Sequence, residues 1–124
     1  MDKLLLIEDE APMGEMYQDG FSKAGFDVIW ALSAEQGLKK LNQSPPDLIL
    51  LDLLLPGKNG LYFLEKLRQM PDKEISQIPV VILSNYDDPE TKKKAFKLGI
   101  ESHLLKTDFT PKELVAEIKR IYKR

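Results

Sequence analysis

Acidic, hydroxyl and amino side chains follow four short apolar runs in this sequence. They are Glu8 and Asp9, then Asp52, Ser84 and Lys106. A carboxylate among apolar residues is costly unless it is neutralised or given a partner, so these groups are expected to meet. The chain has no cysteine, and none of the five residues is a histidine. A carboxylate is therefore the natural nucleophile, and an aspartyl phosphate is a known covalent form of one.

Asp52 is the expected nucleophile because it follows the most apolar run, residues 48–51. Two carboxylates about 4 Å apart repel by about 4 kcal/mol at an effective dielectric constant of about 20. If Glu8 and Asp9 lie beside Asp52, Lys106 offsets only part of that charge. Oxygen ligands of this kind favour Mg²⁺ as the remaining cation. The metal, the Lys106 ammonium and the Ser84 hydroxyl could each bind an oxygen of a transferred phosphoryl group.

Apolar runs alternate with segments of helical periodicity along the chain. Strands are expected at 4–7, 27–31, 48–51, 80–83 and 104–105, and helices at about 12–24, 33–44, 61–70, 88–98 and 110–122. This alternation predicts an α/β fold: one doubly wound domain whose parallel sheet has helices on both faces. Ligands bind at the carboxyl ends of strands in such sheets, where the five residues stand. The strand at 27–31 carries no obvious chemistry.

Composition excludes several classes of protein. A net charge of −2 gives no general attraction to nucleic acid or to anionic membranes, so neither is expected as a direct partner. The single histidine, His103, excludes a multi-histidine metal site. No apolar stretch approaches the roughly 20 residues of a membrane span, and the amino terminus lacks the layout of a signal peptide. A cytoplasmic location is therefore expected.

The order and spacing of the polar residues resemble the response-regulator receiver family of two-component signalling. The resemblance rests on Glu8-Asp9, Asp52 with Pro56 and Gly60 behind it, Ser84 and Lys106. It covers essentially the whole chain and implies one receiver domain, residues 1–124, with the flavodoxin-like (βα)5 fold and strand order 2-1-3-4-5. The family's chemistry is a Mg²⁺-dependent transfer of phosphate from a phosphohistidine to the residue that corresponds to Asp52.

Further roles follow from the resemblance alone. It implies that the Leu54 backbone carbonyl completes a metal site with Glu8, Asp9 and Asp52, and that Ser84 and His103 form a switch. The phosphate donor would be a sensor histidine kinase or a histidine phosphotransfer protein. The domain would catalyse only its own phosphoryl transfer and autodephosphorylation, and is not expected to be an enzyme for other substrates.

The expected output surface combines the predicted helix 88–98, the strand 104–105 and the helix 110–122. Phosphorylation is predicted to strengthen binding of a downstream protein or a fused output domain to this surface. Formation of a homodimer through the same surface is the other expected use of it. No DNA-binding segment follows residue 122 in this sequence. Either the protein acts alone by docking, or it is the receiver of a longer chain.

Three positions depart from the family pattern. Glu8 replaces the first of two aspartates, so its longer arm is suited to holding Mg²⁺ through water. His103 replaces a tyrosine or phenylalanine. Lys106 is followed by Thr107 where the family has a proline in a cis bond. A cis bond without proline costs about 3–4 kcal/mol, so a trans bond and a reshaped loop at 107–109 are predicted.

Alternatives remain for the function and for single residues. A pseudo-receiver would keep the fold as a phosphorylation-independent protein-binding module. A flavodoxin-like cofactor binder would need a phosphate-binding loop after the first strand, where Glu8 and Asp9 would repel a phosphate. His103 is equally well interpreted as a partly exposed strand residue without a switch role. The lysines at 92–94 are interpreted as a solvated helix face, with docking of a partner as a second role.

Overall fold

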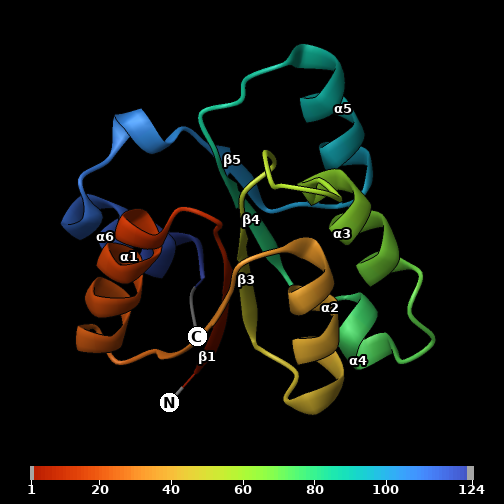
Figure 1. The fold of residues 1–124 in the computed structure, drawn as a ribbon, viewed down its shortest axis with the longest axis horizontal. Coiled ribbons are helices and arrows are strands. Elements are labelled where there is room, and N and C mark those ends of the chain that lie inside the picture. Colours follow the sequence, from red (N-terminus) through yellow and green to blue (C-terminus); the bar gives the residue numbers. More distant parts are fainter. Residues whose placement is uncertain (1, 123–124) are drawn as a thin grey trace.

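The computed structural model describes residues 2–122, so the predicted domain limits 1 and 124 lie outside the described residues. Each strand is followed by at least one helix along the chain (Figure 1). In order they are β1 (Lys3–Ile7), α1 (Ala11–Lys23), β2 (Asp27–Ala31), α2 (Ala34–Gln43), β3 (Leu48–Leu51), α3 (Gly60–Arg68), α4 (Lys73–Ser76), β4 (Val80–Leu83), α5 (Pro89–Lys97), β5 (Ser102–Leu104), the 3₁₀ turn η1 (Lys106–Asp108) and α6 (Pro111–Ile121). None of the described helices has the length and apolar character that a bilayer crossing requires.

The five strands form one parallel sheet in the order β2-β1-β3-β4-β5, which confirms the predicted topology. The apolar residues of α1 and α6 pack on one face, and those of α2, α3, α4 and α5 pack on the other (Figure 1). Leu51 lies between Ile7 and Ile82 in the register, and Leu83 lies beside Leu104. The strands therefore end level with one another, and the residues that follow them share one edge of the sheet.

Two local predictions were wrong. A short helix, α4, lies between α3 and β4, where none was expected; it is capped by the Asp72 side chain and buries Ile75. The last strand is Ser102–Leu104 rather than 104–105, because its position is set by pairing with β4 and not by its apolar residues. On α1 the buried residues are Gly14, Tyr17 and Phe21, whereas Met16 is 47% exposed.

Gly60 begins α3 immediately behind the loop that follows Asp52. A Cβ atom at this position would overlap the Asp52 carbonyl oxygen and lie 2.8 Å from the Leu53 Cα. Both obstacles are backbone, so Gly60→Ala is expected to lower the free energy of unfolding by about 1–3 kcal/mol through overpacking. Urea denaturation followed by circular dichroism measures this change.

Gly20→Ala is the matched control for that substitution. A Cβ atom there meets only the Val115 Cγ2 at 3.7 Å, an ordinary contact. Because alanine is the better helix former, this change within α1 should raise the free energy of unfolding by up to about 1 kcal/mol. If Gly60→Ala proved as stable as the wild type, backbone crowding behind Asp52 would be disproved.

Candidate functional site

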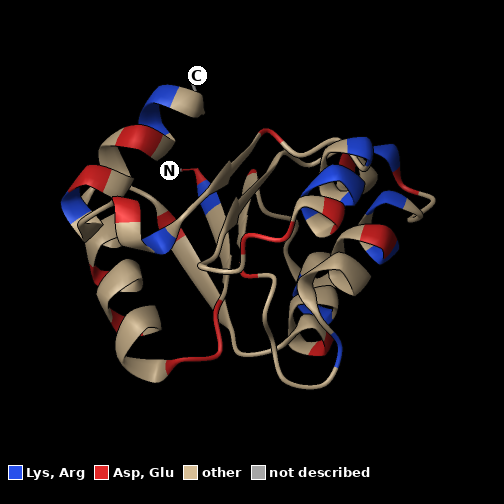
Figure 2. Cartoon of the chain, turned by 90° about the horizontal axis from the view of Figure 1, so that it is seen from above, with Lys and Arg blue, Asp and Glu red and all other residues tan. Residues whose placement is uncertain are grey.

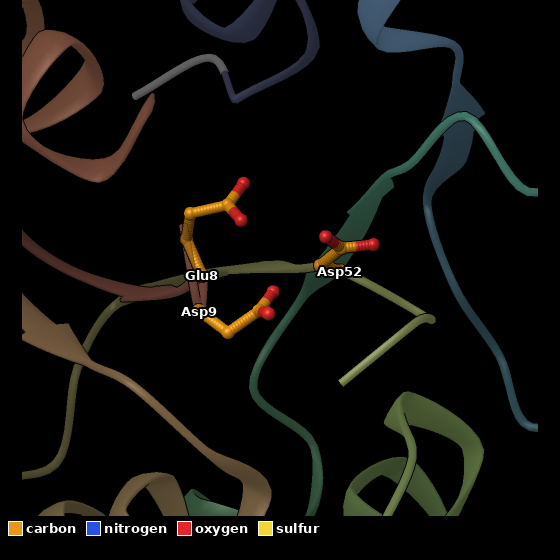
Figure 3. Close-up of side chains that lie close together, drawn as sticks. All are labelled: Glu8, Asp9 and Asp52. Carbon is orange, nitrogen blue, oxygen red and sulfur yellow. The ribbon is translucent and has the colours of Figure 1, made fainter. Parts of the chain in front are cut away.

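Three carboxylates gather at the carboxyl edge of the sheet. Glu8 and Asp9 follow β1, and Asp52 follows the neighbouring β3 (Figure 3). Each offers an oxygen that lies within 4.8 Å of an oxygen from the other two. Glu8 and Asp52 are 1% and 6% exposed, whereas Asp9 is open to solvent. The cluster is thus buried on one side and accessible on the other.

Lys106 is the cation of this cluster. Its Nζ lies 2.6 Å from Glu8 Oε1 and 2.8 Å from Asp52 Oδ2, and its side chain is only 5% exposed. Burial alone would lower the pKa of Lys106, but its hydrogen bonds to Asp52 and Glu8 outweigh burial and raise that pKa above its ordinary value. The ammonium is therefore charged, and it pairs with two of the three carboxylates.

Glu8 is held through both its side chain and its backbone. Burial raises the pKa of its carboxyl, and the hydrogen bonds from Lys106 and from the Glu10 N–H oppose that rise. The Glu8 N–H donates to the Ala31 carbonyl at 3.0 Å. The Glu8 carbonyl accepts a hydrogen bond of 2.8 Å from the Trp30 indole Nε1–H. The sequence interpretation missed Trp30; the signal that could have found it is the only tryptophan of the chain, placed in the expected second strand.

Asp52 is fixed by its neighbours on both carboxylate oxygens. Oδ2 accepts the hydrogen bond from Lys106, and Oδ1 accepts one of 3.2 Å from the Leu54 N–H. The donor set suits Mg²⁺, because the three carboxylates carry more negative charge than Lys106 offsets and supply only hard oxygen ligands. The role of the Leu54 carbonyl in binding such an ion stays a prediction.

Ser84 directly follows β4 at the same edge of the sheet and is 1% exposed. Its N–H donates to the Leu104 carbonyl at 3.0 Å, and its Oγ accepts a hydrogen bond of 3.2 Å from the Tyr86 N–H. The hydroxyl is thereby held where the β4–α5 loop begins. Its predicted contact with a phosphoryl group stays a prediction.

His103 lies in β5, one residue before Leu104, so its side chain points to the opposite face of the sheet from that of Leu104. The groups that act on its imidazole are Lys92, Asp87 and the Tyr86 backbone rather than the carboxylates of the cluster. Both ring nitrogens are buried without a well-formed hydrogen bond among the described residues. Its predicted role in a switch stays a prediction.

The burial of His103 has a measurable consequence for stability. Burial lowers the pKa of His103, with Lys92 adding to the shift and Asp87 opposing it. The unfolded chain then binds this proton more readily than the folded chain, so the free energy of unfolding falls as the pH drops below about 6.5. His103→Phe should lose that part of the acid sensitivity. Urea denaturation at about pH 7.5 and about pH 5.5 measures it, and identical pH dependence in both proteins would refute this reading.

The peptide bond after Lys106 agrees with the prediction made for it, whereas a reshaping of the loop relative to the family stays a prediction. The Lys106–Thr107 peptide bond is trans, and residues Lys106–Asp108 form the 3₁₀ turn η1. The Thr107 N–H donates to the Asn85 side chain at 3.1 Å. The loops after β4 and β5 are therefore joined directly beside the cluster.

Comparisons with known proteins agree with this geometry. The sequence profile of the response regulator receiver domain matches residues 4–119. The phosphate regulon transcriptional regulatory protein PhoB of Escherichia coli (strain K12) is 36% identical over 122 residues, which are 98% of this chain and 52% of PhoB. The alkaline phosphatase synthesis transcriptional regulatory protein PhoP of Bacillus subtilis is 33% identical over 122 residues, 98% of this chain and 49% of PhoP. The chain spans about half the length of the curated relatives it matches.

Solved structures show the same fold. A putative response regulator from Chloroflexus aurantiacus superposes with a TM-score of 0.82 at 31% identity, covering 97% of this chain and 96% of the other. The chemotaxis response regulator CheY4 of Vibrio cholerae superposes with a TM-score of 0.87 at 24% identity, covering 98% and 99% of the two chains. On its sequence profile, its fold and its polar strand ends, this chain belongs to the response regulator receiver domain family.

Proposed function

We propose that this receiver domain accepts a phosphoryl group on Asp52 from a phosphohistidine of a sensor histidine kinase or a histidine phosphotransfer protein. Membership of the family implies phosphoacceptor signalling. The observation that carries the proposal is the buried Asp52 carboxylate, paired with Lys106 and grouped with two further acids. No other acid in the cluster has both the burial and the central position in the sheet.

In the proposed reaction an Asp52 oxygen forms a bond to phosphorus while the bond from phosphorus to the donor nitrogen breaks, which leaves the donor as a free imidazole. Lys106 and Ser84 would each bind an oxygen of the transferred group. Glu8, Asp9, Asp52 and the Leu54 carbonyl would hold Mg²⁺, which when bound supplies positive charge opposite the phosphoryl oxygens. The same residues would later position a water for autodephosphorylation.

Incubation with acetyl phosphate and Mg²⁺ tests this proposal without a kinase. The intact wild-type protein should gain one phosphoryl group by mass spectrometry, and the gain should disappear when EDTA removes the metal. A wild-type chain whose mass stays unchanged over a range of Mg²⁺ concentrations would contradict the proposal. That result would favour the phosphorylation-independent binding module.

The signal would leave through the output surface formed by α5, β5 and α6. Phe96 of α5 is 48% exposed on this surface. The same helix carries Lys92, Lys93, Lys94 and Lys97, and Figure 2 shows basic residues on the helices of that side of the sheet. Phosphorylation would shift an equilibrium between two conformations of this surface that differ by a few kcal/mol. The shift would change the affinity for a copy of the chain, a downstream protein or a fused output domain.

Phosphorylation is predicted to strengthen association at this face. Sedimentation of the phosphorylated and unphosphorylated chain measures self-association, and a binding assay measures any isolated partner. Phe96→Ala should weaken the association of the phosphorylated form, because it removes exposed apolar area, while leaving the gain of mass intact. Equal affinity of both forms for every partner, the chain itself included, would defeat the prediction.

A further inference from the structure

Two neighbouring residues of β2 hold the backbone of Glu8. The Ala31 carbonyl accepts the Glu8 N–H at 3.0 Å, which extends the pairing of β1 with β2 by one residue. The Glu8 carbonyl accepts its hydrogen bond from a side chain and not from the backbone of β2: the Trp30 indole N–H donates to it at 2.8 Å. A side chain therefore completes the backbone pairing at the point where the acidic segment leaves the sheet.

The Trp30 indole is itself held in place by α1. Gly14 is buried, and a Cβ atom there would overlap the indole Cζ2 and Cε2 atoms and lie 2.7 Å from Cη2. Glycine inside a helix is unfavourable relative to alanine, so its presence at this contact fits a need for space. The ring also packs against the apolar cluster between the sheet and α1.

We propose that Trp30 is a positioning residue for the metal-binding acids, acting through the hydrogen bond from its indole N–H to the Glu8 carbonyl. That carbonyl belongs to the peptide bond that joins Glu8 to Asp9, so its orientation sets the direction from which Asp9 enters the cluster. Asp9 is solvent-exposed, unlike Glu8 and Asp52, and gains most from a fixed backbone. The inference rests on the proposed function, because it concerns the same carboxylates.

Trp30→Phe tests the inference, since phenylalanine keeps an aromatic ring and loses the N–H. One hydrogen bond of ordinary strength corresponds to an affinity loss of about two- to tenfold. We expect Mg²⁺ affinity, measured by isothermal titration calorimetry, to fall by that factor. Gly14→Ala keeps the indole but displaces it, and should weaken Mg²⁺ binding in the same direction. Because both changes break one contact, the double variant should lose less affinity than the product of the two single losses.

Ile29→Ala is the matched control. Ile29 precedes Trp30 in β2 and packs against the opposite apolar cluster, so this variant should lose stability while its Mg²⁺ affinity stays at the wild-type value. The free energy of unfolding of every variant is measured beside its Mg²⁺ affinity. A role in folding alone would move only the first quantity in Trp30→Phe.

The outcomes separate the inference from the proposed function. Wild-type Mg²⁺ affinity in Trp30→Phe, or an equal loss of affinity in Ile29→Ala, overturns the role of Trp30 and leaves the phosphoacceptor proposal untouched. A wild-type chain that binds Mg²⁺ but gains no phosphoryl group from acetyl phosphate overturns the phosphoacceptor proposal alone. A wild-type chain that binds no Mg²⁺ overturns both.

Discussion

Asp52→Asn is expected to abolish the uptake of phosphate from acetyl phosphate completely. The amide has nearly the same shape as the carboxylate, but it cannot supply the anionic oxygen that attacks phosphorus. The substituted side chain can still accept a hydrogen bond from Lys106, so the fold should be retained. Intact-mass spectrometry of wild type and variant, after identical incubation with Mg²⁺, measures the effect.

Asp9→Asn is the informative control because it removes one acid of the cluster and leaves Asp52 in place. Its uptake of phosphate should be slow at low Mg²⁺ and recover as the Mg²⁺ concentration rises, since the expected defect is in metal affinity. Asp52→Asn should not recover at any Mg²⁺ concentration. Phosphate on the Asp52→Asn variant, located by peptide mapping, would place the nucleophile elsewhere.

The central strands could be predicted because they are buried on both faces. Residues 48–51 and 80–83 are unbroken apolar runs, and the structure has β3 and β4 at those positions. The edge strand β5 was predicted to begin two residues too late in the sequence. Its first two residues, Ser102 and His103, are not apolar and enter the sheet through backbone pairing with β4. A pattern of apolar residues cannot detect a strand whose place is set by its neighbour.

The composition of the cluster could be predicted, and its internal contacts could not. Acids and a lysine at the ends of adjacent parallel strands must meet at one edge, as Glu8, Asp52 and Lys106 do. Whether Lys106 contacts one carboxylate or both depends on the conformation of its long side chain, which the sequence does not specify. The Trp30 contact joins residues 22 apart in sequence, and the close approach of its ring to Gly14 likewise joins two separate elements, β2 and α1. None of these has a local sequence pattern.

Lys106→Met is expected to cause the largest loss of stability among the variants considered. It would leave Glu8 and Asp52, both almost fully buried, without the ammonium that lies within 2.8 Å of each. Removing one partner of a buried ion pair typically costs about 3–5 kcal/mol, because the remaining charge is uncompensated. Urea denaturation measures the loss, and added Mg²⁺ should restore part of it if the metal binds the same carboxylates.

The pH dependence of this variant identifies the cause. Burial already raises the pKa of Glu8, and the contacts with Lys106 that oppose the rise would be gone. A carboxyl whose pKa is higher in the folded than in the unfolded state gains folded stability as the pH falls, so the deficit of Lys106→Met should shrink on acidification. Lys97→Met removes the same charge from an exposed site on α5 and should show neither a large loss nor rescue by Mg²⁺. A deficit in Lys106→Met that is independent of both pH and Mg²⁺ would mean that lost packing, and not uncompensated charge, destabilises the site.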